Sequence, residues 1–245
     1  MNRKQCLTVF LRVNDPAIRE AIALGVDRQG MYDRTMNGVG GIATTFVSPV
    51  FTQFADPQYQ MPERDIEGAI KVLEDAGYTR NADGYFMELN FDVFISGNFV
   101  DIANIFKANM EEIGIKINVN AQEMGAWQTK VIENHDFEIT MLAGYQGPDV
   151  SGLSGRIHTT GGTNIGQYSN PEVDRLLALG VTQSDPAERA ATYSEIQRYM
   201  AEDLPLMLLI DNGYKYVVKN GLTGMPIQEP DKLASSEYSL AQLTK

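Results

Sequence analysis

The chain has 245 residues, 43% apolar and 21% charged, which is the balance of an ordinary folded protein and excludes an intrinsically disordered one. Its formal net charge of −12, with no basic cluster to offset it, argues against nucleic acid or an anionic membrane surface as a partner. No stretch approaches the roughly 18 apolar residues that a membrane-spanning helix needs.

The first predicted elements are a strand and two helices. The strand begins at Cys6, the single cysteine, which we interpret as an incidental thiol because the preceding residues are polar rather than a signal sequence. Asp15-Pro16 is typical of a helix start, and apolar residues at helical spacing follow it to Val26. Asp27 is predicted to cap a second, short helix that ends at Asn37-Gly38.

Helices and strands then alternate over residues 62–145. Pro62 is predicted to open a helix that Gly77 ends, and residues 87–96 alternate as a strand with Ile95 on the apolar face. A helix over 98–114, a strand over 115–122, a short helix over 125–135 and a strand over 137–145 follow. This alternation favours parallel βαβ units and an α/β fold.

The remaining third of the chain is predicted to hold two helices and a strand. The helices start at Asn170-Pro171 and Asp185-Pro186, and the strand covers 204–211, with half of a hairpin at 214–221. Because no repeat, linker or low-complexity segment interrupts the chain, residues 1–245 are predicted to form one unit.

Residues 144–164, GYQGPDVSGLSGRIHTTGGTN, form a polar, glycine-rich loop directly after a predicted strand. Asp149, Ser151, Ser154 and His158 suggest a serine hydrolase, but the segment lacks the Gly-x-Ser-x-Gly turn of such enzymes. The glycines match no phosphate-binding motif in a strand–turn–helix context. Two histidines and one cysteine, far apart in sequence, do not suggest a metal site. We therefore assign no catalytic residue, metal or cofactor, and interpret the loop as the lining of a ligand cleft at a strand's carboxyl end.

Five collinear segments between about Leu7 and Gly224 resemble one family, the extracellular solute-binding proteins of ABC importers in the peptide- and nickel-binding class (family 5). The segments are NDPAIREAIALGVDRQGM, PERDIEGAIKVLEDAGY, FKANMEEIGIKINVN, NIGQYSNPEVDRLL and DPAERAATYSEIQRYMAEDLPLMLL.

The resemblance implies a fold and an organisation. We expect an α/β lobe of the periplasmic binding protein type (type II, cluster C), with a mixed sheet flanked by helices. Proteins of this family have two lobes, and the segments here resemble the C-terminal one, so residues 1–245 are expected to form a single lobe. Residues 1–13 and 205–212 would be hinge-type strands, and the chain would be an excised or truncated lobe.

The resemblance also implies a function. The expected ligand is an oligopeptide or dipeptide, delivered to a membrane permease, and no enzymatic activity is expected. The location would be periplasmic or extracellular, with the membrane reached only through the permease or a lipid anchor of a full-length form. A nickel chelate, an oligosaccharide or an opine are alternative ligands, and a standalone α/β hydrolase that uses the loop is a third hypothesis.

The candidate ligand-binding residues come mostly from the loop at 144–164. In peptide-binding relatives an aspartate after this strand pairs with the ligand's α-amino group, a role that would fall to Asp149 although its spacing departs from the usual pattern by about one residue. Tyr145 stands where the family usually has tryptophan, and Arg156 and His158 are candidate anchors for a carboxylate or for the other lobe. The candidate ligand-binding residues are Trp127, Tyr145, Gln146, Asp149, Arg156 and His158.

Overall fold

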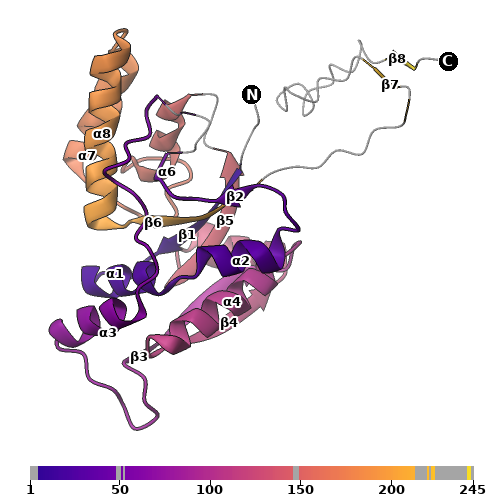
Figure 1. Ribbon diagram of the computed structural model, residues 1–245, viewed down its shortest axis with the longest axis vertical. Coiled ribbons are helices and arrows are strands. Elements are labelled where there is room, and N and C mark those ends of the chain that lie inside the picture. Colours follow the sequence, from indigo (N-terminus) through magenta and orange to yellow (C-terminus); the bar gives the residue numbers. More distant parts are fainter. Residues whose placement is uncertain are drawn as a thin grey trace.

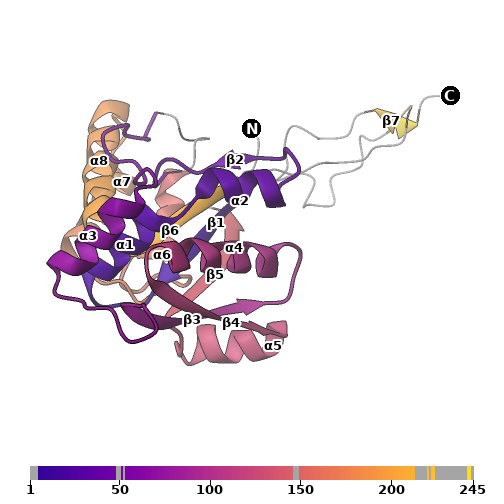
Figure 2. The ribbon, with the colours of Figure 1, turned by 60° about the horizontal axis from the view of Figure 1, so that its bottom comes forward.

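A mixed six-stranded sheet with helices on both faces forms the centre of the molecule (Figures 1 and 2). The computed structural model describes residues 5–47, 51, 53–145, 149–212, 220, 222–223 and 242–243. The strands of the sheet are β1 (Gln5–Leu11), β2 (Gly41–Ile42), β3 (Met87–Phe94), β4 (Ile115–Gln122), β5 (Ile139–Tyr145) and β6 (Leu206–Asn212). Their order is β2-β6-β1-β5-β3-β4, and β7 (Leu222–Thr223) and β8 (Gln242–Leu243) pair separately.

Strand direction divides the sheet into a parallel part and an antiparallel part. β3 pairs in parallel with β4 and β5, as the alternating pattern predicted, whereas β1 lies antiparallel between β5 and β6. β3, β4, β5 and β6 therefore point the same way, and their carboxyl ends meet at one edge of the sheet. The predicted mixed sheet flanked by helices is confirmed.

The helices begin where capping residues occur in the sequence. Asp15, Asp27, Asn170 and Asp185 each accept a backbone N–H from the first turn of the helix that they precede, as predicted. The longer helices are α1 (Pro16–Gly25), α2 (Arg28–Thr35), α3 (Ile66–Asp75), α4 (Phe99–Glu112), α7 (Pro171–Thr182) and α8 (Pro186–Asp203). The short ones are α5 (Met124–Trp127), the π-helix η2 (Gln128–Glu133), the 3₁₀-helix η3 (Val150–Leu153) and α6 (Ser154–Ile157).

The core lies on both faces of β3. Phe91 packs edge-on against Phe106 of α4, with ring centroids 5.1 Å apart, and Phe94 packs against Trp127 of α5 at 4.8 Å. Figure 2 shows α4 and α5 on opposite sides of the β3–β4 pair. Since both faces are covered, β3 is buried throughout its second half, which is typical of parallel strands.

Three sequence predictions differ from the structure or fall outside it. Pro62 does not open α3, because Asp65 caps the helix by accepting the Gly68 N–H at 2.9 Å and the helix begins at Ile66. The Pro62 carbonyl accepts a hydrogen bond from Arg28. Ile95 is not on the apolar face, because β3 ends at Phe94 and leaves the Ile95 side chain 54% exposed. The predicted hairpin half at 214–221 lies almost wholly outside the described residues.

Candidate functional site

The loop at 144–164 begins at the sheet edge formed by the carboxyl ends of four strands. Tyr145, the last residue of β5, is paired with Gln5, and Gln5 is paired with Asn212 at the end of β6. Phe94 and Gln122 end the neighbouring strands β3 and β4 in register. Open α/β sheets bind ligands outside the carboxyl ends of their strands, so this edge is the candidate ligand-binding edge.

Asp149 sits at this edge with its carboxylate already bonded within the chain. Both oxygens accept hydrogen bonds from Arg189 of α8, at 3.0 Å for Oδ2, and Oδ1 also accepts the Ser151 N–H at 3.0 Å. The hydrogen bonds from Arg189 hold the pKa of Asp149 well below its usual range, at about 2. Arg189 is fixed in turn by a hydrogen bond to the Gly180 carbonyl and by stacking on the Tyr193 ring. An ammonium ligand would therefore have to share Asp149 with Arg189.

Arg156 is buried beneath the same edge. Its Nη1 donates to Thr8 Oγ1 of β1 at 2.7 Å, and burial lowers the pKa of its guanidinium. The guanidinium lies against the backbone of Gly144, where an added Cβ would come within 2.7 Å of Nη2. Arg156 therefore joins the start of the loop to β1, and a side chain at position 144 would have to displace its Nη2.

His158 and Trp127 lie at two further places. The His158 Nδ1 accepts the Thr160 N–H at 3.1 Å, and its Nε2 is 3.9 Å from Asp174 of α7. Trp127 is buried and donates its indole N–H to Thr140 of β5 at 3.0 Å. Gln146 and the side chain of Tyr145 lie outside the described part of the chain. The described candidate residues thus hold four separate contacts rather than converging on one cavity, and their ligand-binding role stays a prediction.

Comparison with known proteins identifies the family. The model of the middle part of bacterial extracellular solute-binding proteins, family 5, matches residues 6–164, which is most of the sheet and the whole candidate loop. The chain belongs to this family. Protein XP55 of Streptomyces lividans is 31% identical over 228 residues, which are 87% of this chain and 41% of XP55. The periplasmic murein peptide-binding protein MppA of Escherichia coli is 24% identical, covering 91% of this chain and 42% of MppA.

A solved family structure has the same fold over the entire chain. The oligopeptide-binding protein AppA of Bacillus subtilis, solved with a nonapeptide, superposes with a TM-score of 0.85 at 20% identity. The superposition covers 100% of this chain and 52% of AppA. This family 5 chain therefore spans about two fifths of the length of the curated relatives that it matches, and about half of AppA as solved.

Sequence reasoning missed a buried ion pair next to the candidate edge of the family 5 chain. Asp92 of β3 is fully buried, and its Oδ1 accepts hydrogen bonds from Lys130 of η2 at 2.7 Å and from Gln122 at 2.8 Å. The Asp92 carbonyl also accepts the Thr140 hydroxyl that bonds Trp127. The sequence did hold a signal, because Asp92 is an acid among the apolar residues of β3. The alternating pattern of the strand placed this acid on the solvent-exposed face.

Two cavities lie at the opposite edge of the sheet. One, of about 360 Å³, is lined by residues that follow β1 and precede β6, and the other, of about 460 Å³, by residues around 159–169. Neither is lined by a candidate residue from the sequence. In the described part of the chain, no group of three or more His, Cys, Asp or Glu side chains is placed to hold a metal ion. No helix of this part is long and apolar enough to cross a bilayer.

Proposed function

We propose that this family 5 chain is a lobe of the solute-binding component of an ABC importer, and that its solute is a peptide of the oligopeptide or dipeptide class. The observation that carries the proposal is the family match over residues 6–164, which includes the candidate edge. The peptide class is supported by relatives named as peptide-binding proteins, MppA and AppA among them.

The peptide would bind at the carboxyl edge of β3, β4, β5 and β6, against the loop at 144–164. Asp149 is the proposed partner of the α-amino group, because a desolvated ammonium needs a charged hydrogen-bonding partner. In that role Asp149 would be shared between the ammonium and Arg189, with which it already forms an ion pair. Tyr145, Gln146, Arg156, His158 and Trp127 are the proposed further residues of the site.

β1 and β6 are the proposed hinge-type strands, within residues 1–13 and 205–212. They are adjacent and antiparallel, and Gln5 and Asn212 meet at the candidate edge. A second lobe attached through them would face this edge. A peptide that contacts both lobes would favour a closed state of the two-lobed protein. A membrane permease would recognise this closed state.

Peptide titration followed by NMR and calorimetry tests the proposal on the 245-residue chain. We expect weak binding, with a Kd of about 1 mM, since a lobe without its partner buries only part of the ligand. Amide shifts should cluster at residues 92–95, 120–123 and 149–156. An N-acetylated peptide should lose the shifts near Asp149, since it has no ammonium group.

Two outcomes would contradict the proposal. The first is the absence of any shift at the candidate edge with peptides at about 10 mM. The second is binding that is equal for free and N-acetylated peptides, which would remove Asp149 from the amine role. A Kd of about 1 µM or tighter would contradict the expectation that one lobe binds weakly.

A further inference from the structure

The cavity of about 360 Å³, which we call the distal cavity, lies at the sheet edge opposite the carboxyl ends of β3, β4, β5 and β6. The end of β1 at Leu11 and the next residues, 12–14, form one wall, and residues 166–170, which precede α7, form another. Asp203, the last residue of α8, and Pro205, just before β6, complete it. Its volume falls at the lower end of the roughly 300–1,000 Å³ of small-molecule sites.

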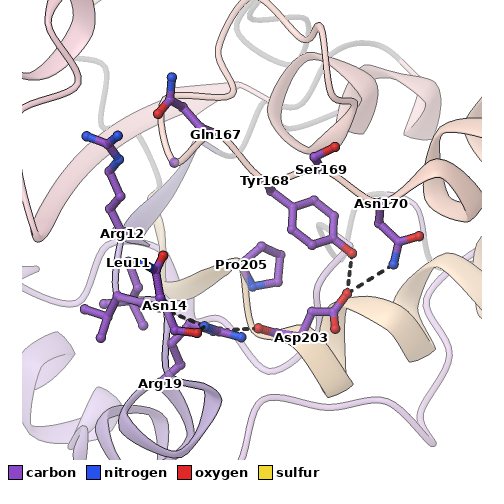
Figure 3. Close-up of a pocket in the computed structure, with 12 residues that line it drawn as sticks. Leu11, Arg12, Asn14, Arg19, Gln167, Tyr168, Ser169, Asn170, Asp203 and Pro205 are labelled. Carbon is purple, nitrogen blue, oxygen red and sulfur yellow. Dashed lines mark hydrogen bonds between the residues drawn. The ribbon is translucent and has the colours of Figure 1, made fainter.

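Groups of opposite charge line the distal cavity. Figure 3 shows the Arg12 guanidinium and the Gln167 amide on one side, and Tyr168, Asn170 and Asp203 on the other. Two arginines, Arg12 and Arg19, line this cavity in a chain whose net charge is −12.

The cationic side of the cavity has hydrogen-bond donors without a partner in the described part of the chain. Arg12 is exposed, and its side chain makes one hydrogen bond within the described residues, from Nη1 to the His135 carbonyl. Its Nε and Nη2, and the Gln167 side-chain amide, make no hydrogen bond in that part of the chain. The other arginine, Arg19, holds the wall, because it donates to the backbone carbonyls of Asp203, Val13 and Asn14. Arg12 is therefore the group left to bind an anion.

The anionic side has one hydrogen-bond acceptor without a partner in the described part of the chain. Tyr168 donates its hydroxyl to Asp203 Oδ2 at 2.5 Å, and the Asn170 amide donates to the same oxygen at 3.3 Å. Burial and the hydrogen bond to Asp203 raise the pKa of Tyr168, so the phenol keeps its proton and its donor role at neutral pH. Oδ1 of Asp203 accepts no hydrogen bond within the described residues. A cationic group entering the cavity would find this oxygen open.

Backbone strain concentrates around this cavity. Four described residues other than glycine have positive φ, and three of them adjoin it. Gln167 (φ 54°) lines the cavity, Leu204 (φ 44°) joins Asp203 to Pro205, and the carbonyl of His135 (φ 50°) holds Arg12. Residues in such conformations persist only where the surrounding structure holds them in place, and they cluster at binding sites.

We propose that the distal cavity binds a small zwitterion of the α-amino acid type. The carboxylate would be held by Arg12 Nε and Nη2 with the Gln167 amide, a charge-assisted pairing that guanidinium geometry favours. The ammonium would be held by Oδ1 of Asp203. A simple dianion fits worse, because Asp203 would repel its second charge. The site is separate from the proposed peptide edge and does not depend on it.

Titration of the 245-residue chain with free L-serine and L-leucine, followed by the amide shifts of residues 166–170, tests the proposal. Two analogues of each amino acid serve as probes of the zwitterion: the N-acetyl form lacks the ammonium, and the amide form lacks the carboxylate. The free amino acid should bind with a Kd of about 1 mM, and each analogue about tenfold more weakly.

Variants test the cationic side of the cavity, while the N-acetyl analogue tests the side of Asp203. Arg12→Gln should weaken binding about tenfold, whereas Arg34→Gln, the same change on the exposed face of α2, should leave it within about twofold. Gln167→Gly removes the amide but suits the positive φ, so it should weaken binding while the chain keeps its circular dichroism spectrum and melting temperature. This variant decides the matter if Arg12→Gln fails to fold.

The proposal is overturned by any of three results. These are equal binding of the free amino acid and either analogue, unchanged binding in both Arg12→Gln and Gln167→Gly, and no shift at residues 166–170 at about 50 mM ligand. Asp149→Asn should leave the amide shifts of residues 166–170 unchanged. A negative result for the amino-acid site can therefore be distinguished from a negative result for the proposed peptide site.

Discussion

The ion pair between Asp149 and Arg189 permits a quantitative prediction at the candidate edge. Asp149→Asn removes the charge but keeps the cap of η3, because asparagine is as good an N-cap as aspartate. What is lost is the paired hydrogen bonding from Arg189. The side chains are 40% and 20% exposed, so solvent screens the pair, and we place its contribution at about 1 kcal/mol, the upper end for exposed pairs. The melting temperature should fall by about 2–4 °C.

The same prediction has a pH signature. The folded pKa of Asp149 is about 2, below the roughly 3.9 of an unfolded chain. A lowered folded pKa means that the stabilisation is complete above about pH 4 and is lost as the pH falls through about 2. The difference in unfolding free energy between the natural chain and Asp149→Asn should therefore shrink over this window.

Urea unfolding at several pH values measures this difference, and a double-mutant cycle with Arg189→Gln isolates the pair from the other bonds of Arg189. A coupling free energy below about 0.2 kcal/mol at neutral pH would refute the assignment of a stabilising pair. So would a difference that stays constant from about pH 7 to pH 2.5, because it would mean that Asp149 titrates alike in both states.

Two further predictions concern contacts near the same edge. Gly144→Ala should lower the unfolding free energy by about 1–3 kcal/mol in urea titration, because the new Cβ would displace the buried guanidinium of Arg156; an unchanged midpoint would contradict this packing. Lys130→Met should lower the unfolding free energy by about 3 kcal/mol, because it leaves the carboxylate of Asp92 buried without its cation. Lys71→Met, which breaks an exposed ion pair on a helix, is the control and should lower it by less than about 0.5 kcal/mol. Equal losses in the two variants would contradict the difference in burial.

Local signals in the sequence predicted much of the fold. Helix starts at Asp15 and Asp185 could be predicted because an N-cap is a contact between residues two or three apart. The parallel arrangement of β3, β4 and β5 follows from alternating strands and helices. The antiparallel position of β1 could not be predicted this way, since it depends on pairing with strands as distant in sequence as β5 and β6, where even Leu11 and Ile139 are 128 positions apart.

The candidate site was harder to predict, because its contacts join distant residues. Asp149 and Arg189 are 40 positions apart, and Arg156 and Thr8 are 148 apart, so no spacing rule connects them. Asp92 shows a different failure. Alternation placed it on a polar face, but the second half of β3 is covered by helices on both sides, so the acid there is buried and paired.

The partners of the candidate residues also determine how ligand experiments must be read. Asp149 is bonded to Arg189, Arg156 to Thr8 and Trp127 to Thr140, so replacing any of them removes a contact within the chain as well as a proposed ligand contact. A weaker Kd alone therefore does not assign a residue to the site. Comparing free with N-acetylated peptide separates the loss of a contact within the chain from the loss of a ligand contact. Loss of folded protein weakens the binding of both peptides by the same factor. Loss of an ammonium partner weakens binding of the free peptide alone, and only that selective loss in Asp149→Asn would place this carboxylate against the ligand.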